Sequence, residues 1–117
     1  MKFTDPLKLN YEFHRLYSKG KSAVTPCLVV YARHTRRNRN RIGFTVSTKL
    51  GHAVVRNRVR RRLREIYRLH EEDFIQGLDL VVVARSRSVT ASYAALEHSF
   101  LKLAGSLGLL REDLKKS

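Results

Sequence analysis

A run of arginines on an amphipathic segment is the feature that most constrains how this chain folds. Between residues 53 and 72, apolar side chains recur at spacings of four, four and three. They are Val55, Val59, Leu63 and Ile66. This spacing places them within about 80° of one another on a helical wheel. It predicts a helix about 30 Å long, whose apolar stripe packs on a sheet.

The rest of this helix is almost entirely cationic. Seven arginines occur in the thirteen residues 56–68, where Glu65 is the one acid. A row at i, i+4 spacing consists of Arg56, Arg60, Arg64 and Arg68, and Asn57 and Arg61 extend it. Like charges at this spacing destabilise an isolated helix by roughly 0.2–0.5 kcal/mol per pair. The pattern therefore predicts a polyanionic partner rather than a solvated neutral face.

Charge in the whole chain supports the same conclusion. Its 117 residues include 24 Lys and Arg against 10 Asp and Glu, a net charge of +14, and residues 33–68 hold most of the excess. Arginine, which outnumbers lysine here, presents a planar fork of donors that matches phosphate oxygens. Nucleic acid is the favoured partner. A membrane-surface helix is disfavoured because the apolar side is narrow, lacks Trp and Phe, and is needed to cover the sheet.

Several classes of protein are excluded by simple features. No window approaches the ~18 apolar residues that span a bilayer, and the polar start of the chain lacks a signal peptide. The single cysteine, Cys27, excludes an internal disulfide framework and fits a reducing, cytoplasmic setting. We therefore expect a cytoplasmic protein without a membrane partner.

The remaining segments predict an α/β fold in one domain, residues 1–117. We expect helices at 10–19 and 90–107, strands at 27–33, 41–47 and 79–85, and a frayed charged tail at 111–117. The first two strands, joined by a short loop, favour an antiparallel pair. The third is a continuous apolar run, which is typical of a strand covered on both faces.

Three aromatic residues form a second candidate site. Phe13 and Tyr17 lie one helical turn apart, and Tyr31 shares a strand face with Val29 and Arg33. If the first helix packs beside that face, the rings line a groove where unstacked bases stack on aromatic planes. Spacing alone leaves this groove and ordinary core packing as equal alternatives.

Catalytic and metal-binding patterns are missing. The five histidines show no metal-ligand spacing, and no glycine-rich phosphate cradle occurs. The acids at 71–73 have the pattern of a solvated helix end, and Asp79 that of a strand-entry residue. We predict no catalytic residue and no metal ligand in the chain itself.

Residues 43–65, GFTVSTKLGHAVVRNRVRRRLRE, resemble the signature of the bacterial ribonuclease P protein subunit. In that family a strand ending in Val-Ser leads through Lys and Gly to Ala-Val-x-Arg-Asn-Arg on a helix, and the order of elements matches over nearly the whole chain. The resemblance implies an α+β two-layer sandwich like the second domain of ribosomal protein S5. Its mixed sheet would carry a long central arginine-rich helix in a left-handed βαβ crossover, although such connections are generally right-handed.

The resemblance also implies an activity, the removal of the 5′ leader from precursor tRNA by hydrolysis of one phosphodiester bond. A catalytic RNA subunit with bound Mg²⁺ performs this step, and the protein binds that RNA and the single-stranded leader, with no obligatory protein partner. Residues matching the RNA-binding motif or adding phosphate contacts are Lys49, Arg56, Asn57, Arg58, Arg60, Arg61, Arg62, Arg64 and Arg68. Those matching the leader-binding cleft are Phe13, Tyr17, Ser22, Val29 and Tyr31.

Two positions depart from the family pattern. Thr48 stands where a second lysine is usual, which puts one phosphate contact in doubt. Tyr17 stands where phenylalanine is common and adds a hydroxyl group. Two other functions stay open: a ribosomal or rRNA-assembly protein, which would co-purify with ribosomal particles, and a stand-alone nuclease, which would cleave precursor tRNA without added RNA.

Overall fold

The structure, a computed structural model, describes residues 2–112. Its strands are β1 (Thr4–Pro6), β2 (Lys21–Val24), β3 (Leu28–His34), β4 (Asn40–Thr45) and β5 (Leu78–Ala84). Its helices are α1 (Asn10–Lys19), α2 (Ala53–His70) and α3 (Tyr93–Ser106), with 3₁₀ turns at Thr48–Leu50, Glu71–Asp73 and Ser86–Ser88. The predicted helices and strands are confirmed. The strands β1 and β2 were not predicted, because each is too short to show an alternating pattern.

The sheet is mixed, with the order β1-β4-β5-β3-β2. Strands β1, β4 and β5 are parallel, whereas β3 runs antiparallel to both β5 and β2. The predicted direct pairing of residues 27–33 with 41–47 is wrong, because β5 lies between β3 and β4. The apolar β5 takes the centre of the sheet, where both of its faces are buried. The α2 crossover joins the parallel neighbours β4 and β5, and its left-handedness stays a prediction.

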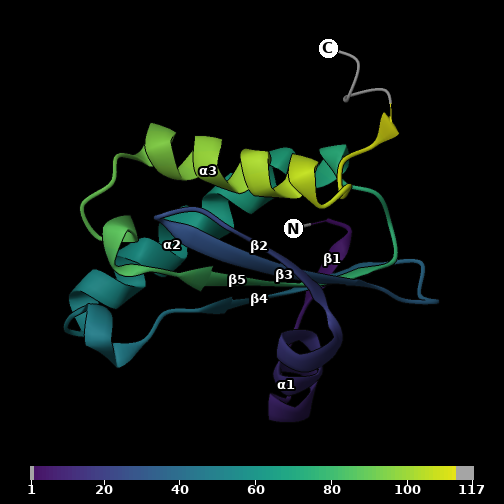
Figure 1. Ribbon diagram of the computed structural model, residues 1–117, viewed down its shortest axis with the longest axis horizontal. Coiled ribbons are helices and arrows are strands. Elements are labelled where there is room, and N and C mark those ends of the chain that lie inside the picture. Colours follow the sequence, from purple (N-terminus) through teal and green to yellow (C-terminus); the bar gives the residue numbers. More distant parts are fainter. Residues whose placement is uncertain (1, 113–117) are drawn as a thin grey trace.

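Helices cover both faces of the sheet, α2 and α3 one face and α1 the other (Figure 1). On β5, Leu80 and Val82 belong to the large core under α2 and α3, whereas Val81 packs with Leu7 and Leu16 on the α1 face. The prediction that this strand is covered twice is confirmed.

The apolar stripe of α2 fixes the orientation of the helix. Val59, Leu63 and Ile66 are buried, and Tyr67, one residue beyond the predicted stripe, is buried as well. The Tyr67 hydroxyl hydrogen-bonds Thr4 Oγ1 of β1 at 2.7 Å. Burying each of these side chains contributes roughly 1.5–3 kcal/mol. Rotation of α2 about its axis would expose these buried side chains, so the opposite side of the helix is held toward solvent.

The end of α2 differs from the prediction of a solvated cluster of acids. Glu71 is buried and accepts hydrogen bonds from the backbone N–H groups of Lys2 and Phe3, at 2.9 and 3.0 Å. It therefore anchors the start of the chain. Of the tail predicted to fray, residues 113–117 lie outside the described residues, and the Arg111 N–H donates to the Asp73 carbonyl at 2.8 Å.

Candidate nucleic-acid interface

The outward side of α2 presents guanidinium groups that the protein itself does not neutralise. Arg58, Arg61 and Arg64 are exposed. Within residues 2–112 none of the three has a hydrogen-bond or ion-pair partner. A cluster of like charges without counter-charges raises the local positive potential, which attracts polyanions.

The other arginines of α2 have partners, and only one partner is a carboxylate. Arg56 donates to the Gly51 carbonyl at 3.2 Å, and Arg62 donates to the Ala91 carbonyl at 3.3 Å. Arg60 donates to the side-chain oxygen of Asn57 at 3.1 Å. These neutral acceptors orient the guanidinium groups and leave their charge in place.

Arg68 is the exception on this face. It forms two hydrogen bonds with Glu65, at 3.0 and 2.6 Å. The hydrogen bond from Arg68 lowers the pKa of the Glu65 carboxyl group. Both side chains are exposed, so the pair adds little stability.

Lys49 lies just before the arginine helix, in the 3₁₀ turn Thr48–Leu50. The Ser47 side chain caps this turn by accepting the Lys49 N–H at 3.2 Å. Lys49 is exposed and adjoins the start of α2 along the chain. The nine residues predicted to bind the RNA subunit therefore lie on the turn and the helix that follows it. Their role in binding RNA stays a prediction.

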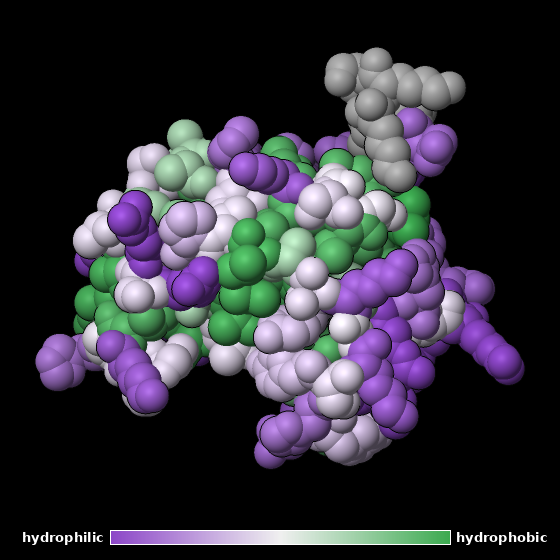
Figure 2. All heavy atoms as spheres, viewed as in Figure 1, coloured by the Kyte–Doolittle hydropathy of each residue, from purple (hydrophilic) through white to green (hydrophobic). Residues whose placement is uncertain are grey.

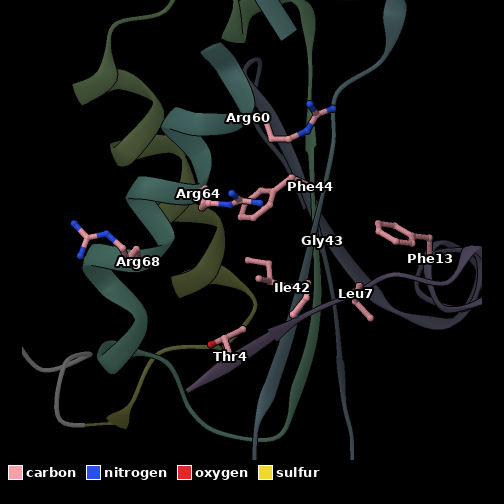
Figure 3. A pocket seen from close by; sticks show the side chains of 10 residues that line it. Thr4, Leu7, Phe13, Ile42, Gly43, Phe44, Arg60, Arg64 and Arg68 are labelled. Carbon is pink, nitrogen blue, oxygen red and sulfur yellow. The ribbon is translucent and has the colours of Figure 1, made fainter. Parts of the chain in front are cut away.

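A recess joins the arginine row to the edge of the sheet. Arg60, Arg64 and Arg68 line one side of a cavity of about 450 Å³ whose other walls include Ile42 and Phe44. Figure 3 shows the arginines on the α2 side of β4, with Phe13 and Leu7 on the far side of Gly43. The recess exists because β1 pairs with β4 only as far as Ile42, which leaves the outer edge of β4 open beyond that point.

Glycine at position 43 is what allows Phe13 to lie against β4. A Cβ atom added there would lie 2.5 Å from Cζ of the Phe13 ring, far closer than any ordinary contact. Phe13 is half-buried and packs against the small core of Leu7, Leu16 and Val81. Phe13 is thus a core residue with one side at the recess, and its part in binding a leader stays a prediction.

The five residues predicted to bind the leader come together on the α1 face of the sheet. Tyr17 and Tyr31 pack edge to face, with ring centroids 5.0 Å apart. Ser22 lies directly opposite Tyr31 in the β2–β3 register, and Val29 lies two residues from Tyr31 on the same face of β3. We call these five residues (Phe13, Tyr17, Ser22, Val29 and Tyr31) the aromatic groove, after the site that they are predicted to form. Tyr17 is 38% exposed, so one ring of the groove is available for stacking.

Sequence reasoning missed Thr45 as a member of this groove. Its Oγ1 hydrogen-bonds the Tyr17 hydroxyl at 2.9 Å and so fixes the ring that departs from the family's usual phenylalanine. Because successive side chains of a strand point to opposite faces, residues 43 and 45 of the predicted strand share a face. This pattern could not indicate that the face lies beside α1, because the position of β4 depends on β5.

Residues 2–112 present no group of side chains suited to Mg²⁺. Mg²⁺ takes oxygen ligands, usually one or two carboxylates, and among residues 2–112 no three His, Cys, Asp or Glu side chains are grouped to hold a metal ion. The buried carboxylates of Glu12 and Asp79 instead bind Arg41. Separately, no helix in the described part of the chain is long and apolar enough to cross a membrane.

The Ribonuclease P family model matches residues 1–108. The chain belongs to the ribonuclease P protein family. The ribonuclease P protein component of Alkaliphilus oremlandii is 42% identical over 110 residues, which cover 94% of this chain and 96% of that protein. Membership of this family implies a part in tRNA 5′ processing, within an endoribonuclease complex that contains RNA.

Solved ribonuclease P proteins share the fold. The Staphylococcus aureus protein superposes with a TM-score of 0.84 at 29% identity, over 91% of this chain and 97% of that one. The Thermotoga maritima protein gives a TM-score of 0.76 at 27% identity, over 84% and 93%. These matches confirm the mixed α/β fold that the resemblance implied.

Proposed function

We propose that this chain is the RNA-binding subunit of ribonuclease P, with two RNA-binding surfaces. The first surface is the arginine face of α2, which consists of Arg56, Asn57, Arg58, Arg60, Arg61, Arg62, Arg64 and Arg68. This face and Lys49 bind the catalytic RNA, and the aromatic groove binds the single-stranded 5′ leader of precursor tRNA. One observation carries the proposal: Arg58, Arg61 and Arg64 project from a helix whose other side is fixed in the core, without carboxylate partners in residues 2–112.

The arginine face positions the protein on the catalytic RNA. Guanidinium groups bind phosphate oxygens through paired hydrogen bonds, and each phosphate that is neutralised releases condensed counterions. Binding is therefore strong at low salt and weakens as salt rises. The added positive charge also reduces the Mg²⁺ concentration that the folded RNA requires.

The aromatic groove holds the leader. Bases stack on Tyr31 and on the exposed side of Tyr17, and such stacking contributes about 1–3 kcal/mol per base with little sequence preference. The hydrogen bond between the Tyr17 and Thr45 hydroxyl groups orients the ring before RNA binds. The groove therefore stabilises the complex with precursor tRNA relative to mature tRNA, which has no leader.

Mg²⁺ would be held by the RNA subunit and would supply the activated water for hydrolysis of the phosphodiester bond, which leaves a 5′-phosphate on the mature tRNA. The chain's own part is to bind and to orient. Its carboxylates serve structure: Glu12 and Asp79 bind Arg41, and Glu71 anchors the start of the chain.

Reconstitution tests the proposal directly. The protein is added to the ribonuclease P RNA of its own genome at low Mg²⁺, and 5′ processing of precursor tRNA is measured beside RNA alone and protein alone. We expect cleavage only when both components are present. Cleavage by protein alone would support a stand-alone nuclease, and co-purification with ribosomal particles without stimulation of cleavage would support a ribosomal protein.

The test variant is Arg58→Ala/Arg61→Ala/Arg64→Ala. Its control is the single variant Lys102→Ala, which removes one exposed cation from α3. We expect the triple variant to lose stimulation at low Mg²⁺ and to recover part of it when protein and Mg²⁺ are raised. Lys102→Ala should behave like the wild type. Equal stimulation by all three proteins would contradict the role of the arginine face.

A further inference from the structure

A second cluster of cations lies on the α1 face, away from the arginine helix. The loop between β3 and β4 and the neighbouring strand ends enclose a cavity of about 530 Å³. We call it the loop cavity; its charged lining residues are Arg15, Arg33, Arg36, Arg37, Arg41 and Asp79. Figure 2 shows hydrophilic residues gathered over α1 and this loop, at the lower right of the view.

The loop is held in place at both ends. The N–H and the hydroxyl of Thr35 both donate to the Gly77 carbonyl, at 2.7 and 3.1 Å. Asn40 donates to the Ile75 carbonyl and accepts the Leu78 N–H, at 3.0 and 2.9 Å. Gly77 has a φ of +86°, and a Cβ atom there would lie 2.9 Å from the Arg37 carbonyl oxygen. The arginines of this loop are therefore carried by a fixed backbone.

The acids near the cavity are already engaged. Arg41 makes two hydrogen bonds to Asp79, at 2.9 and 2.7 Å, and a further one to Glu12. Arg37 approaches Asp79 only to 3.7 Å and is 54% exposed. Arg33 and Arg36 are exposed, and within residues 2–112 neither has an ion-pair partner. The cavity thus keeps an excess of positive charge on a rigid frame, which an anion would offset.

The loop cavity and the aromatic groove lie on the same face of the sheet. On α1, Leu16 faces the sheet, and Phe13 and Tyr17 lie on one flank with the groove, whereas Arg15 lies on the other flank with the cavity. Arg33 follows Tyr31 by two residues on the same face of β3, a step of about 7 Å along the strand. The α2 arginines lie on the opposite face of the sheet.

We propose that the loop cavity binds backbone phosphates of the 5′ leader, at nucleotides beyond those stacked in the aromatic groove. Its lining offers five guanidinium groups, and its one ring is the imidazole of His34. A lining dominated by guanidinium groups suits phosphate recognition without base preference. The leader is the source of these phosphates because it occupies the groove on this same face. This inference rests on the proposed function and extends it to longer leaders.

The test uses the reconstituted holoenzyme and precursor tRNAs whose leaders grow one nucleotide at a time. We compare the wild type with Arg33→Ala/Arg36→Ala and with Lys102→Glu, which removes the same two units of charge from the exposed side of α3. For the wild type we expect affinity to rise again once the leader extends past the groove. The double variant should lose this second rise, with about tenfold weaker binding of long leaders and unchanged binding of short ones.

Three results would overturn the inference. One is a wild-type affinity that does not rise beyond the groove, and another is a double variant that matches Lys102→Glu at every length. The third is an equal loss at all lengths together with weaker binding of the RNA subunit, which would assign the phosphates to that RNA. Failure of the proposed function would look different, since the wild type would then not distinguish precursor from mature tRNA at all. Arg33→Lys/Arg36→Lys, which keeps the charge, should retain most of the binding. Unchanged binding of short leaders by Arg33→Ala/Arg36→Ala shows that the fold of that variant is intact.

Discussion

Arginine is used in two opposite ways in this molecule. Arg41 on β4 has a side chain that is only 16% exposed, and its guanidinium group donates to the carboxylates of both Asp79 and Glu12. Arg61 and Arg64 on α2 are exposed, and no carboxylate of residues 2–112 contacts them. The residue type is the same, but only the first is neutralised by the fold.

The difference shows how function can be separated from stability in a very basic chain. An arginine whose donors are satisfied inside the protein belongs to the fold, because removing it strands buried carboxylates. An exposed arginine without a partner contributes little to the fold, and its donors remain available to a phosphate. We therefore expect the part of the +14 charge that no carboxylate neutralises to contribute most to RNA binding.

The largest effect we predict is on stability, from Arg41→Ala. The substitution leaves Asp79 and Glu12 buried without their main partner. Breaking such a pair by removing one side costs about 3–5 kcal/mol. Urea denaturation followed by circular dichroism measures the free energy of unfolding.

Arg61→Ala is the matched control for this experiment. It should change the free energy of unfolding by less than about 0.5 kcal/mol, as exposed positions do. If the two variants proved equally stable, the distinction between a structural and a functional arginine would be lost.

In RNA binding, the exposed arginines of α2 should have the large effect that Arg41 has on stability. Arg61→Ala/Arg64→Ala should weaken binding of the catalytic RNA by about 3 kcal/mol, taking the low end for two hydrogen bonds to charged groups. The slope of log K against log salt should also fall by about two, one for each phosphate that is no longer neutralised. Filter binding across a salt series measures both quantities. An unchanged slope would mean that these arginines do not contact phosphates.

The arginine face could be predicted from sequence because its pattern is local. An i, i+4 apolar stripe fixes which side of a helix is buried, and the remaining positions must then face solvent. Val59, Leu63 and Ile66 are buried as expected, and the exposure of Arg61 and Arg64 follows from their positions on the helix. The same reasoning placed Tyr31 and Val29 on one face of β3.

What could not be predicted depends on contacts between distant segments. The order of strands places β5 between β3 and β4, so the neighbour of each strand is not its neighbour in sequence. Glu71 is buried because backbone N–H groups 69 and 68 residues away reach it. Asp79 was interpreted as a strand-entry residue because its partner, Arg41, lies on another strand. No local pattern carries such information.

A smaller effect is expected in the aromatic groove, where binding depends on stacking instead of charge. Tyr31→Ala removes a ring that packs against Tyr17 and should weaken binding of precursor tRNA by about 1–3 kcal/mol. Binding of mature tRNA should not change, and the salt slope should stay that of the wild type. Holoenzyme affinities for the two tRNAs provide the measurement.

Tyr11→Ala controls for the loss of a tyrosine, since Tyr11 is exposed on α1 and its ring contacts Arg15 rather than a residue of the groove. It should bind both tRNAs as the wild type does. Equal losses of affinity for precursor and mature tRNA in Tyr31→Ala would show that the groove does not bind the leader.

The smallest predicted effect concerns His70, whose ring forms ion pairs with carboxylates only when it is protonated. Its Nδ1 lies 3.2 Å from Asp73 Oδ2 and its Nε2 lies 2.9 Å from Glu97 Oε2, so both ring nitrogens face carboxylates. Burial acts to lower the pKa of His70, but the hydrogen bonds and charges of Glu97 and Asp73 raise it above its ordinary value. The stabilisation is therefore complete below the unfolded-state pKa and is lost as the pH rises through the folded-state pKa.

His70→Gln should accordingly destabilise the protein by less than about 1 kcal/mol near pH 5.5, and by less still near pH 8.5. Urea denaturation at the two pH values measures the change. Because His70 links the end of α2 to α3 and lies outside the arginine face, RNA binding should be unaltered at either pH. A destabilisation that grew with pH would show that the folded protein prefers neutral His70. His70 would then not be a paired cation of the kind that Arg41 is.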